Sequence, residues 1–200
     1  MIDTIVLASG NKGKLKEFNE VLSHLNVSVR PQSEFNVSDA DETGLSFVEN
    51  AILKARHAAQ ATGLPALADD SGLEVDALNG APGIYSARFA GTHGDDTANN
   101  AKLVKALANV PTEQRTARFR CVLVFMRHAE DPTPLICQGS WEGIILDAPK
   151  GENGFGYDPL FYIPALDKVS AELPPEEKNK LSHRGQAVQQ FIEHIQSYLR

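Results

Sequence analysis

Apolar residues near the start of the chain follow two different periods. Thr4–Ala8 is a nearly continuous apolar run, which is typical of a central strand covered on both faces. Between residues 15 and 25, leucine and phenylalanine recur at helical spacing and predict an amphipathic helix. Val27–Pro31 then reads as a second strand, ended by its proline. A strand, a turn, a helix and a strand in this order predict an α/β protein.

A second helix is predicted over residues 46–62. Ser46 and Glu49 form the pattern of a capping box at its start, and a glycine follows its end. Asn50, Lys54 and His57 fall on one polar stripe of this helix. The stripe is either a solvated face or, because the helix leads directly into the next strand, a source of side chains such as Lys54 for a site there.

The remaining apolar runs predict a mixed sheet. Leu64–Ala68 reads as a buried strand and residues 73–78 as a half-exposed one. A helix over residues 95–108 precedes two long strands, Arg118–Met126 and Leu135–Ile145. Their short connection predicts an antiparallel hairpin, so the sheet contains both parallel and antiparallel pairs.

Composition limits the class of protein without identifying a function. Two hundred residues suit one domain or two closely joined lobes, and 42% hydrophobic residues are enough for a core. The formal charge of −7 argues against a protein that coats nucleic acid. Cys121 and Cys137 lie in apolar runs, as reduced and buried thiols do. With no signal peptide and no apolar run of membrane length, we expect a cytoplasmic protein with neither a membrane nor a nucleic-acid partner.

The predicted strand at Leu64–Ala68 leads into two carboxylates, a hydroxyl and a glycine. A carboxylate at the edge of a core is costly unless a cation meets it. Because side chains of a strand alternate between faces, only one of the two aspartates can face a given site. We expect Asp70 and Ser71 to be the chemical pair and Asp69 to be structural. The alternative is a polar turn between two strands.

Two glycine-rich stretches and an acidic one add candidate ligand contacts. Ser9–Lys14 joins a strand to a helix, a layout that binds phosphate through backbone N–H groups or is simply a tight turn. Glu42 could join Asp70 in holding a hard divalent cation, or belong to a solvated acidic loop. In the loop after residue 151, Phe155 lies between two glycines and could stack on a planar ring. Tyr157 could equally pin this loop to the core.

The C-terminal region predicts a short helix from about residue 174 and a longer one capped by Ser182. His183 and Arg184 then stand in the first turn of the last helix, where a cation opposes the helix dipole. They are either tolerated surface residues or are placed there for an electron-rich ligand atom. Phosphate contacts, a hard cation and a planar ring together describe a nucleotide, for which Mg²⁺ is the expected cation.

Five motifs together resemble the inosine triphosphate pyrophosphatase family, whose bacterial members are the XTP/dITP diphosphatases. They are Ser9–Lys14, Thr43–Ala51, Ala68–Gly72, Phe155–Asp158 and Ser182–Gly185. The resemblance extends from about Ile5 to the last helix, and the one departure is Ser9, where the family often has threonine. It implies one pyrophosphatase domain over residues 1–200. Its fold would be an elongated, twisted mixed sheet flanked by helices, with two lobes and a cleft between them.

The resemblance implies hydrolysis of ITP, dITP and XTP to the monophosphate and pyrophosphate, which keeps these nucleotides out of DNA and RNA. By family analogy Asp70 is the general base, and Glu42 and Asp70 bind Mg²⁺. The implied triphosphate contacts are Ser9, Gly10, Asn11, Lys12, Gly13, Lys14 and Lys54. The implied nucleoside contacts are Ser71, Phe155, Gly156, Tyr157, Asp158, Lys178, His183 and Arg184. Members of the family are usually homodimers.

Two other classes of function fit the same residues less well. A pyrophosphatase for modified pyrimidine nucleotides would differ in the pocket around Phe155 and Arg184. A non-catalytic nucleotide-binding module would have no need for a carboxylate that activates water, so Asp70 with Glu42 argues against it.

Overall fold

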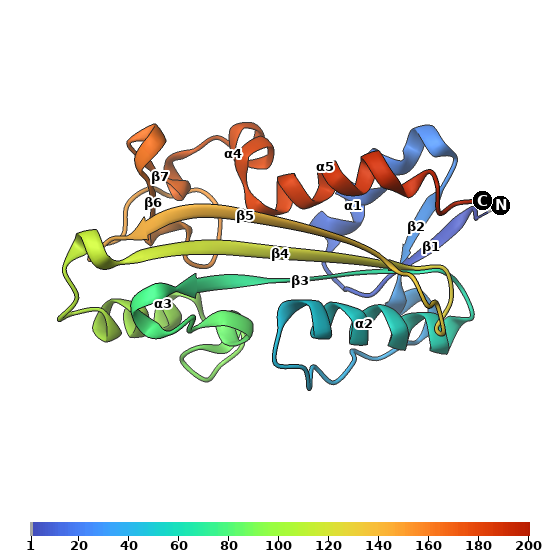
Figure 1. Cartoon of the computed structure of the whole chain (residues 1–200), viewed down its shortest axis with the longest axis horizontal. Coiled ribbons are helices and arrows are strands. Elements are labelled where there is room, and N and C mark those ends of the chain that lie inside the picture. The colour runs from blue at the N-terminus through green and yellow to red at the C-terminus, as the bar shows by residue number, and fades with distance from the viewer. Residues whose placement is uncertain (1) are drawn as a thin grey trace. The chain divides into compact units, whose positions relative to one another are not determined.

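The computed structural model describes residues 2–200, and in them a seven-stranded sheet with helices beside it (Figure 1). The strands are β1 (Thr4–Leu7), β2 (Ser28–Pro31), β3 (Ala66–Val75), β4 (Thr116–Met126), β5 (Leu135–Ile145), β6 (Phe161–Ile163) and β7 (Lys168–Val169). The α-helices are α1 (Lys12–Leu22), α2 (Phe47–Thr62), α3 (Asp96–Ala106), α4 (Pro175–Leu181) and α5 (His183–Ile195). The prediction of a mixed α/β fold is confirmed.

The order of the strands is β2-β1-β3-β4-β5-β6-β7, and their directions are mixed. β1 runs parallel to both β2 and β3, whereas β5 with β6 and β6 with β7 are antiparallel pairs. β4 and β5 are neighbours joined only by residues 127–134. A connection this short cannot cross over to a parallel partner, so these two strands form the predicted antiparallel hairpin.

The chain divides into two compact units. Unit 1 comprises the residues up to Asp70, Val122–Gln138 and Ala187–Arg200, and unit 2 comprises Ser71–Cys121 and Gly139–Gln186. The long strands β3, β4 and β5 each give residues to both. That residues 1–200 act as one pyrophosphatase domain stays a prediction.

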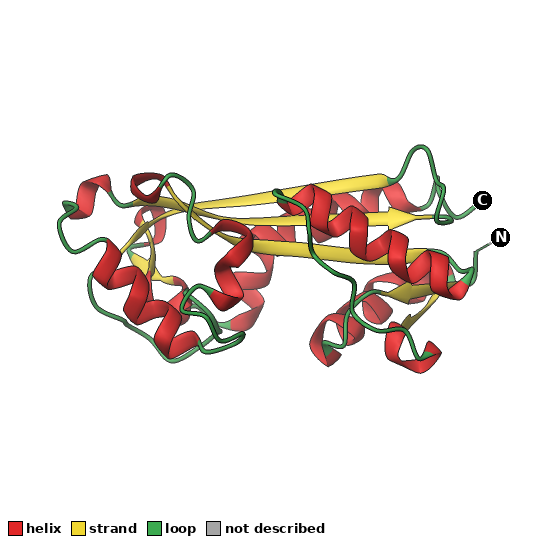
Figure 2. Cartoon of the chain, turned by 90° about the horizontal axis from the view of Figure 1, so that it is seen from below, coloured by secondary structure: helices red, strands yellow, loops and turns green. Residues whose placement is uncertain are grey.

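In unit 1 the central strands are covered on both faces, as the continuous apolar run in β1 predicts. Ile5, Val6 and Leu7 are completely buried. Figure 1 shows α1 and α2 on opposite sides of the strands, and Figure 2 shows α2 in front of them from below. The two ends of the described chain lie together, since the N–H of Ile2 donates to the carbonyl of Leu199 at 3.1 Å.

In unit 2 the core is built around aromatic rings. Phe161 lies between Phe119 and Trp141, with ring centroids 4.5 and 5.5 Å away. Leu103 of α3 and Leu107, directly after the helix, are completely buried in the same cluster and anchor the helix there. The helix is shorter than the predicted 95–108, and its residues after Ala106 form a turn.

β3 differs from the prediction. The sequence Asp69-Asp70-Ser71-Gly72 is not a turn between two strands, because one continuous strand runs from Ala66 to Val75. Its apolar residues at both ends are buried, which keeps the polar centre in the extended conformation. The alternative of a polar turn at this position is therefore wrong, and the two aspartates keep the alternating geometry of a strand.

Two further features of the described chain bear on its chemistry. Cys121 and Cys137 are buried thiols, as predicted, and burial raises the pKa of the Cys137 thiol to about 11. No helix within residues 2–200 is long and apolar enough to cross a membrane.

The loop between β4 and β5 is held by a buried carboxylate. Asp131 has a fully buried side chain that accepts bonds from the Arg127 guanidinium at 2.6 and 2.9 Å, and from the backbone N–H groups of Arg127 and Thr133 at 3.0 Å each. The hydrogen bonds from Arg127 hold the pKa of Asp131 well below its usual range.

Asp131→Asn is expected to destabilise the protein at neutral pH by about 3 kcal/mol, because it removes a buried charge that holds four donors. For a chain of this size that lowers Tm by roughly 6–12 °C. The depressed pKa means that the carboxylate stabilises the fold above the unfolded-state pKa of 3.8, and that this contribution is lost as pH falls through the lower folded-state pKa. The difference in Tm between the two proteins should therefore shrink below about pH 4.

The matched control is Asp76→Asn, which breaks the ion pair between Asp76 and Arg118. The Asp76 carboxylate, unlike that of Asp131, is largely exposed. Its effect on stability should stay below about 1 kcal/mol. Equal losses in the two variants would contradict the role given to Asp131.

Candidate active site

The predicted phosphate loop lies at the start of α1, and its residue Asn11 caps the helix. Asn11 Oδ1 accepts the N–H groups of Gly13 at 2.9 Å and Lys14 at 3.1 Å, and Ser9 Oγ accepts the N–H of Asn11. Two of the N–H groups expected to face an anion are therefore already bonded in this structure. Gly10 and Lys12 are exposed at the same turn.

Lys14 reaches from α1 to β3. Its ammonium lies 2.8 and 2.6 Å from the two carboxylate oxygens of Asp69, which is 4% exposed. A buried aspartate is thus compensated by a cation, which agrees with the structural role expected of Asp69. Lys14 itself was expected to contact phosphate, and here it lies against Asp69.

The side chain of Asp70 lies on the opposite face of β3 from that of Asp69 and contacts α2. Lys54 Nζ lies 3.1 Å from Asp70 Oδ1 and 3.8 Å from Glu42 Oε1. These three side chains form what we call the carboxylate–lysine cluster. The proposed solvated face of α2 is wrong for Lys54, because its side chain is largely buried and paired with two acids. The sequence prediction that Lys54 could reach the site of the aspartates is confirmed.

The electrostatics of the cluster leave Asp70 poorly neutralised. Burial raises the pKa of Asp70 above its usual value, the charge of Lys54 opposes this, and the nearby acids Glu42 and Asp69 add to the rise. Asp70 Oδ2 is buried and has no hydrogen-bond partner within residues 2–200. A buried carboxylate oxygen without a donor is costly, so this atom is a strong candidate for contact with a ligand, a cation or a water.

The cluster fits a magnesium ion that relies on its substrate. Residues 2–200 contain no group of three or more His, Cys, Asp or Glu side chains arranged to hold a metal. Mg²⁺ is usually bound by one or two carboxylates together with substrate phosphates and waters. Glu42 and the unpartnered oxygen of Asp70 supply that number and type of ligand.

A buried asparagine supports the loop that carries Glu42. Asn50 is completely buried on α2, and its Oδ1 accepts the N–H of Gly44 at 2.8 Å. A Cβ on Gly44 would stand 2.7 Å from that oxygen, so the approach requires glycine. The polar stripe contained Asn50, but the sequence did not indicate that it would hold this loop.

In unit 2 the loop after residue 151 presents one aromatic ring and buries the other. Phe155 is 77% exposed, whereas Tyr157 is buried and its O–H donates to the carbonyl of Ser86 at 2.7 Å. Tyr157 therefore pins the loop to the core, which was the alternative reading for it. Phe155 remains the candidate for stacking on a ring.

Asp158 connects this loop to Lys178. Its carboxylate accepts the N–H of Phe155 at 2.9 Å, the O–H of Ser170 at 2.9 Å and the ammonium of Lys178 at 2.5 Å. The same ammonium lies 4.8 Å from the centre of the Phe155 ring. Because Asp158 is buried, its carboxylate bonds the loop and Lys178 and has little contact with solvent.

The turn between α4 and α5 depends on two predicted residues. Ser182 Oγ accepts the N–H of Gly185 at 3.1 Å and caps α5 as expected. A Cβ on Gly185 would collide with the carbonyl oxygen of Asn179, so only glycine allows this approach. His183 stacks on Phe119 with ring centroids 4.9 Å apart, and Arg184 is half-buried beside it in the chain. Ser71 is exposed on β3.

Comparison with known proteins agrees with this geometry. Residues 5–194 match the model of the Ham1 family. The chain belongs to the Ham1 family. Relatives named dITP/XTP pyrophosphatase include one from Vibrio cholerae, 62% identical over 96% of both chains, and one from Thioalkalivibrio sulfidiphilus, 61% identical over 96% of this chain and 98% of the relative.

Solved structures of Ham1 proteins have the same fold. A HAM1 protein from Coxiella burnetii is 52% identical, with a TM-score of 0.94 over 98% of this chain and all of that chain. The Ham1 protein of Staphylococcus aureus is 44% identical, with a TM-score of 0.90 over 98% of this chain and 99% of that chain. The resemblance inferred from the five motifs is confirmed at the level of the family.

Proposed function

We propose that this protein hydrolyses the deaminated purine nucleotides dITP, XTP and ITP to the monophosphate and pyrophosphate. The observation that carries the proposal is the carboxylate–lysine cluster, with the buried and unpartnered oxygen of Asp70 at its centre. The high sequence identity to relatives named dITP/XTP pyrophosphatase also supports the proposal. Such an activity would keep these nucleotides out of DNA and RNA.

In this proposal the basic residues of unit 1 neutralise the triphosphate. Lys12 and Lys14, with the turn from Ser9 to Gly13, stand at the N-terminus of α1, which favours anions. A phosphate there would compete with Asn11 for the N–H groups of Gly13 and Lys14 and with Asp69 for Lys14. Lys54 would contact the triphosphate beside Asp70.

Asp70 orients the attacking water and accepts its proton. It must be ionised to do so, and Lys54 supports the ionised form by lowering its pKa against the effect of burial. Glu42 and Asp70 would hold Mg²⁺, which when bound neutralises charge on the leaving pyrophosphate. The magnesium ion is our proposal from the type and number of these oxygen ligands.

The residues of unit 2 are proposed to read the nucleoside. Phe155 stacks on the base, and Ser71, Gly156, Tyr157, Asp158, Lys178, His183 and Arg184 complete its surroundings. An arginine can only donate hydrogen bonds, so Arg184 matches the 6-oxo group of a deaminated purine. Adenine presents a 6-amino donor instead, and an unmatched buried donor costs about 1–3 kcal/mol, which favours ITP over ATP.

The test is release of pyrophosphate with Mg²⁺ from ITP, dITP and XTP, against ATP, GTP and dTTP. We expect fast release from the three deaminated purines and slow release from the controls, with none after chelation of the metal. Equal release from all triphosphates, or preference for dTTP, would reject the substrate assignment and retain a pyrophosphatase. Absence of release from every triphosphate would reject the enzyme and favour a nucleotide-binding module.

We also propose that the protein acts as a homodimer in the cytoplasm, as the family resemblance and the composition predict. Sedimentation equilibrium on the purified chain should give about twice the monomer mass of 21.7 kDa. A monomer at assay concentrations would reject the dimer and leave the proposed reaction standing.

A further inference from the structure

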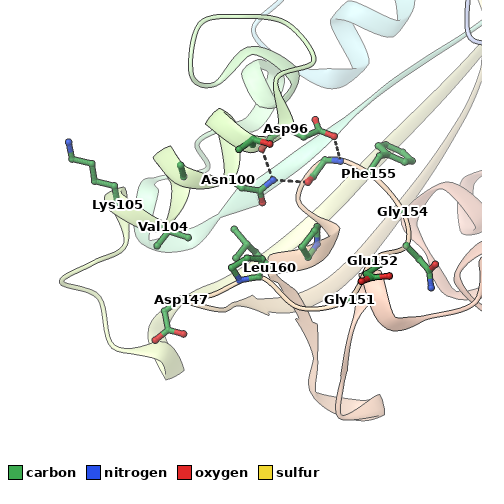
Figure 3. Close-up of a pocket in the computed structure, with 16 residues that line it drawn as sticks. Asp96, Asn100, Val104, Lys105, Asp147, Gly151, Glu152, Gly154, Phe155 and Leu160 are labelled. Carbon is green, nitrogen blue, oxygen red and sulfur yellow. Dashed lines mark hydrogen bonds between the residues drawn. The ribbon is translucent and has the colours of Figure 1, made fainter.

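The loop that carries Phe155 is anchored after it by the buried Tyr157 and has a glycine on each side of the Phe155 ring. Gly154 and Gly156 on either side of it have φ values of +77° and +59°, in the region that favours glycine. A cavity of about 680 Å³ lies beside this loop, lined by α3 on one side and by the loop on the other (Figure 3). On the side of α3 the loop borders this cavity, and the contacts that join it to the helix there are hydrogen bonds.

Two side chains of α3 bond both backbone groups of Gly156. Asp96 accepts its N–H at 2.7 Å, and the Asn100 amide donates to its carbonyl at 2.8 Å. Figure 3 draws both bonds, with the Phe155 ring pointing away from Asn100. Asp96 and Asn100 are four residues apart and so lie on one face of the helix. Together they hold the peptide units on both sides of Gly156, directly after Phe155.

The helix behind these two side chains is anchored in the core of unit 2. Leu103 of α3 and Leu107, the residue after its last turn, are buried in the core of unit 2 and anchor the helix. Asn99, next to Asn100, donates to the carbonyl of Ala87 and accepts the N–H of Ala90. A bond from α3 therefore ties the loop to a fixed element.

The orientation of Asn100 carries a cost in stability. Its amide nitrogen donates to the carbonyls of Asp96 and Gly156, which fixes the orientation of the side chain. Its oxygen is then buried without a partner in the described part of the chain. An apolar residue of similar size would avoid the unsatisfied acceptor. Asparagine at this position thus leaves one acceptor unsatisfied while its amide donates to Gly156.

We propose that Asp96 and Asn100 are positioning residues for base recognition. They fix the Gly156 peptide and thereby the place of the Phe155 ring, against which the nucleobase stacks. This inference rests on the proposed function, which assigns the stacking role to Phe155. It predicts that both residues act on affinity for the base and leave the phosphate chemistry of unit 1 unchanged.

The first experiment compares Asn100→Leu and Asp96→Ala with the unaltered protein. Each variant should raise KM for ITP about tenfold, the order of a lost stacking contact, with kcat within about threefold. Affinity for IMP, which carries the base without the pyrophosphate, should fall by a similar factor, and affinity for pyrophosphate should not change. Asp96→Asn keeps an oxygen acceptor for the Gly156 N–H, so its KM for ITP should stay close to that of the unaltered protein.

The matched control is Lys105→Ala, on the same helix and lining the same cavity without a bond to Gly156. It should leave KM, kcat and IMP affinity unchanged. Thermal unfolding is measured for every variant, so that a change in KM can be separated from a loss of folded protein.

The second experiment is a double-mutant cycle with Phe155→Ala. If Asn100 acts through Phe155, Asn100→Leu should have no further effect on KM or IMP affinity once Phe155 is alanine. Effects that multiply, or a fall in kcat with KM unchanged, would overturn the inference. Failure of the unaltered protein to release pyrophosphate from ITP would instead reject the proposed function, and the cycle in IMP affinity would still decide the role of Asn100.

Discussion

Asp70→Asn should abolish pyrophosphate release from ITP and leave nucleotide binding measurable. The amide keeps the size of the side chain and cannot accept the proton of the attacking water, so kcat should fall by about 10²–10⁴. The Oδ2 oxygen of Asp70 is buried and unpartnered within residues 2–200, and the Glu42 carboxylate lies farther from the Lys54 ammonium than that of Asp70 does, at 3.8 against 3.1 Å. The measurement is single-turnover hydrolysis together with titration of ITP in Ca²⁺.

The matched control for this variant is Asp69→Asn, one residue away on the same strand. Asp69 faces α1 and pairs with Lys14, so its loss should raise KM through a misplaced Lys14 and lower kcat much less than the change at Asp70. If Asp70→Asn kept a normal kcat, the assignment of the base would be wrong. If both variants lost kcat equally, the alternating roles of the two aspartates would fail.

Lys54→Met should lower kcat/KM by about a hundredfold at neutral pH and move the acidic limb of the pH profile upward. Lys54 lowers the pKa of Asp70, so its removal raises that pKa further. Because Asp70 must be ionised, the activity is lost as pH falls through its pKa, and the higher pKa moves this loss to higher pH. The defect should therefore be larger at about pH 6 than at about pH 9.

Lys54→Arg is the control, because it keeps the positive charge beside Asp70 and Glu42. It should return the acidic limb to its original place even if its bulk weakens triphosphate binding. An acidic limb that does not move in Lys54→Met would contradict the electrostatic role and leave Lys54 as a phosphate contact alone.

Much of the fold could be predicted because periodicity and caps act locally. The capping residue Ser46, the terminating Gly63 and the strand Leu135–Ile145 lie where the sequence placed them. β3 could not be predicted in the same way, since Asp69 and Asp70 have low strand propensity. Lys54, from the helix just before β3, could be expected near Asp70, but the pairing of Asp69 with Lys14, 55 residues away, is not contained in a single-sequence pattern.

The candidate site could be predicted where burial of a residue costs much free energy unless a partner compensates it. A carboxylate in an apolar run, as at Asp70, demands a cation wherever the chain folds. Supporting residues gave no such signal. Asn50 and Asn100 look like ordinary helix positions, and their roles appear only when Gly44 and Gly156 are brought against them. The capping of α1 by Asn11 was likewise hidden, because asparagine also suits a phosphate-binding turn.

The two buried cysteines allow local opening of the fold to be followed by alkylation of their thiols. Cys121 belongs to unit 2 and Cys137 to unit 1, and both thiols are buried in the sheet. Only a thiolate reacts with alkylating reagents, and burial suppresses that form of Cys137 in the folded state by raising the pKa of its thiol. The rate at which each thiol is alkylated under native conditions therefore measures how often its own unit opens. The natural sequence thus allows the stability of the two units to be read separately, without an introduced label.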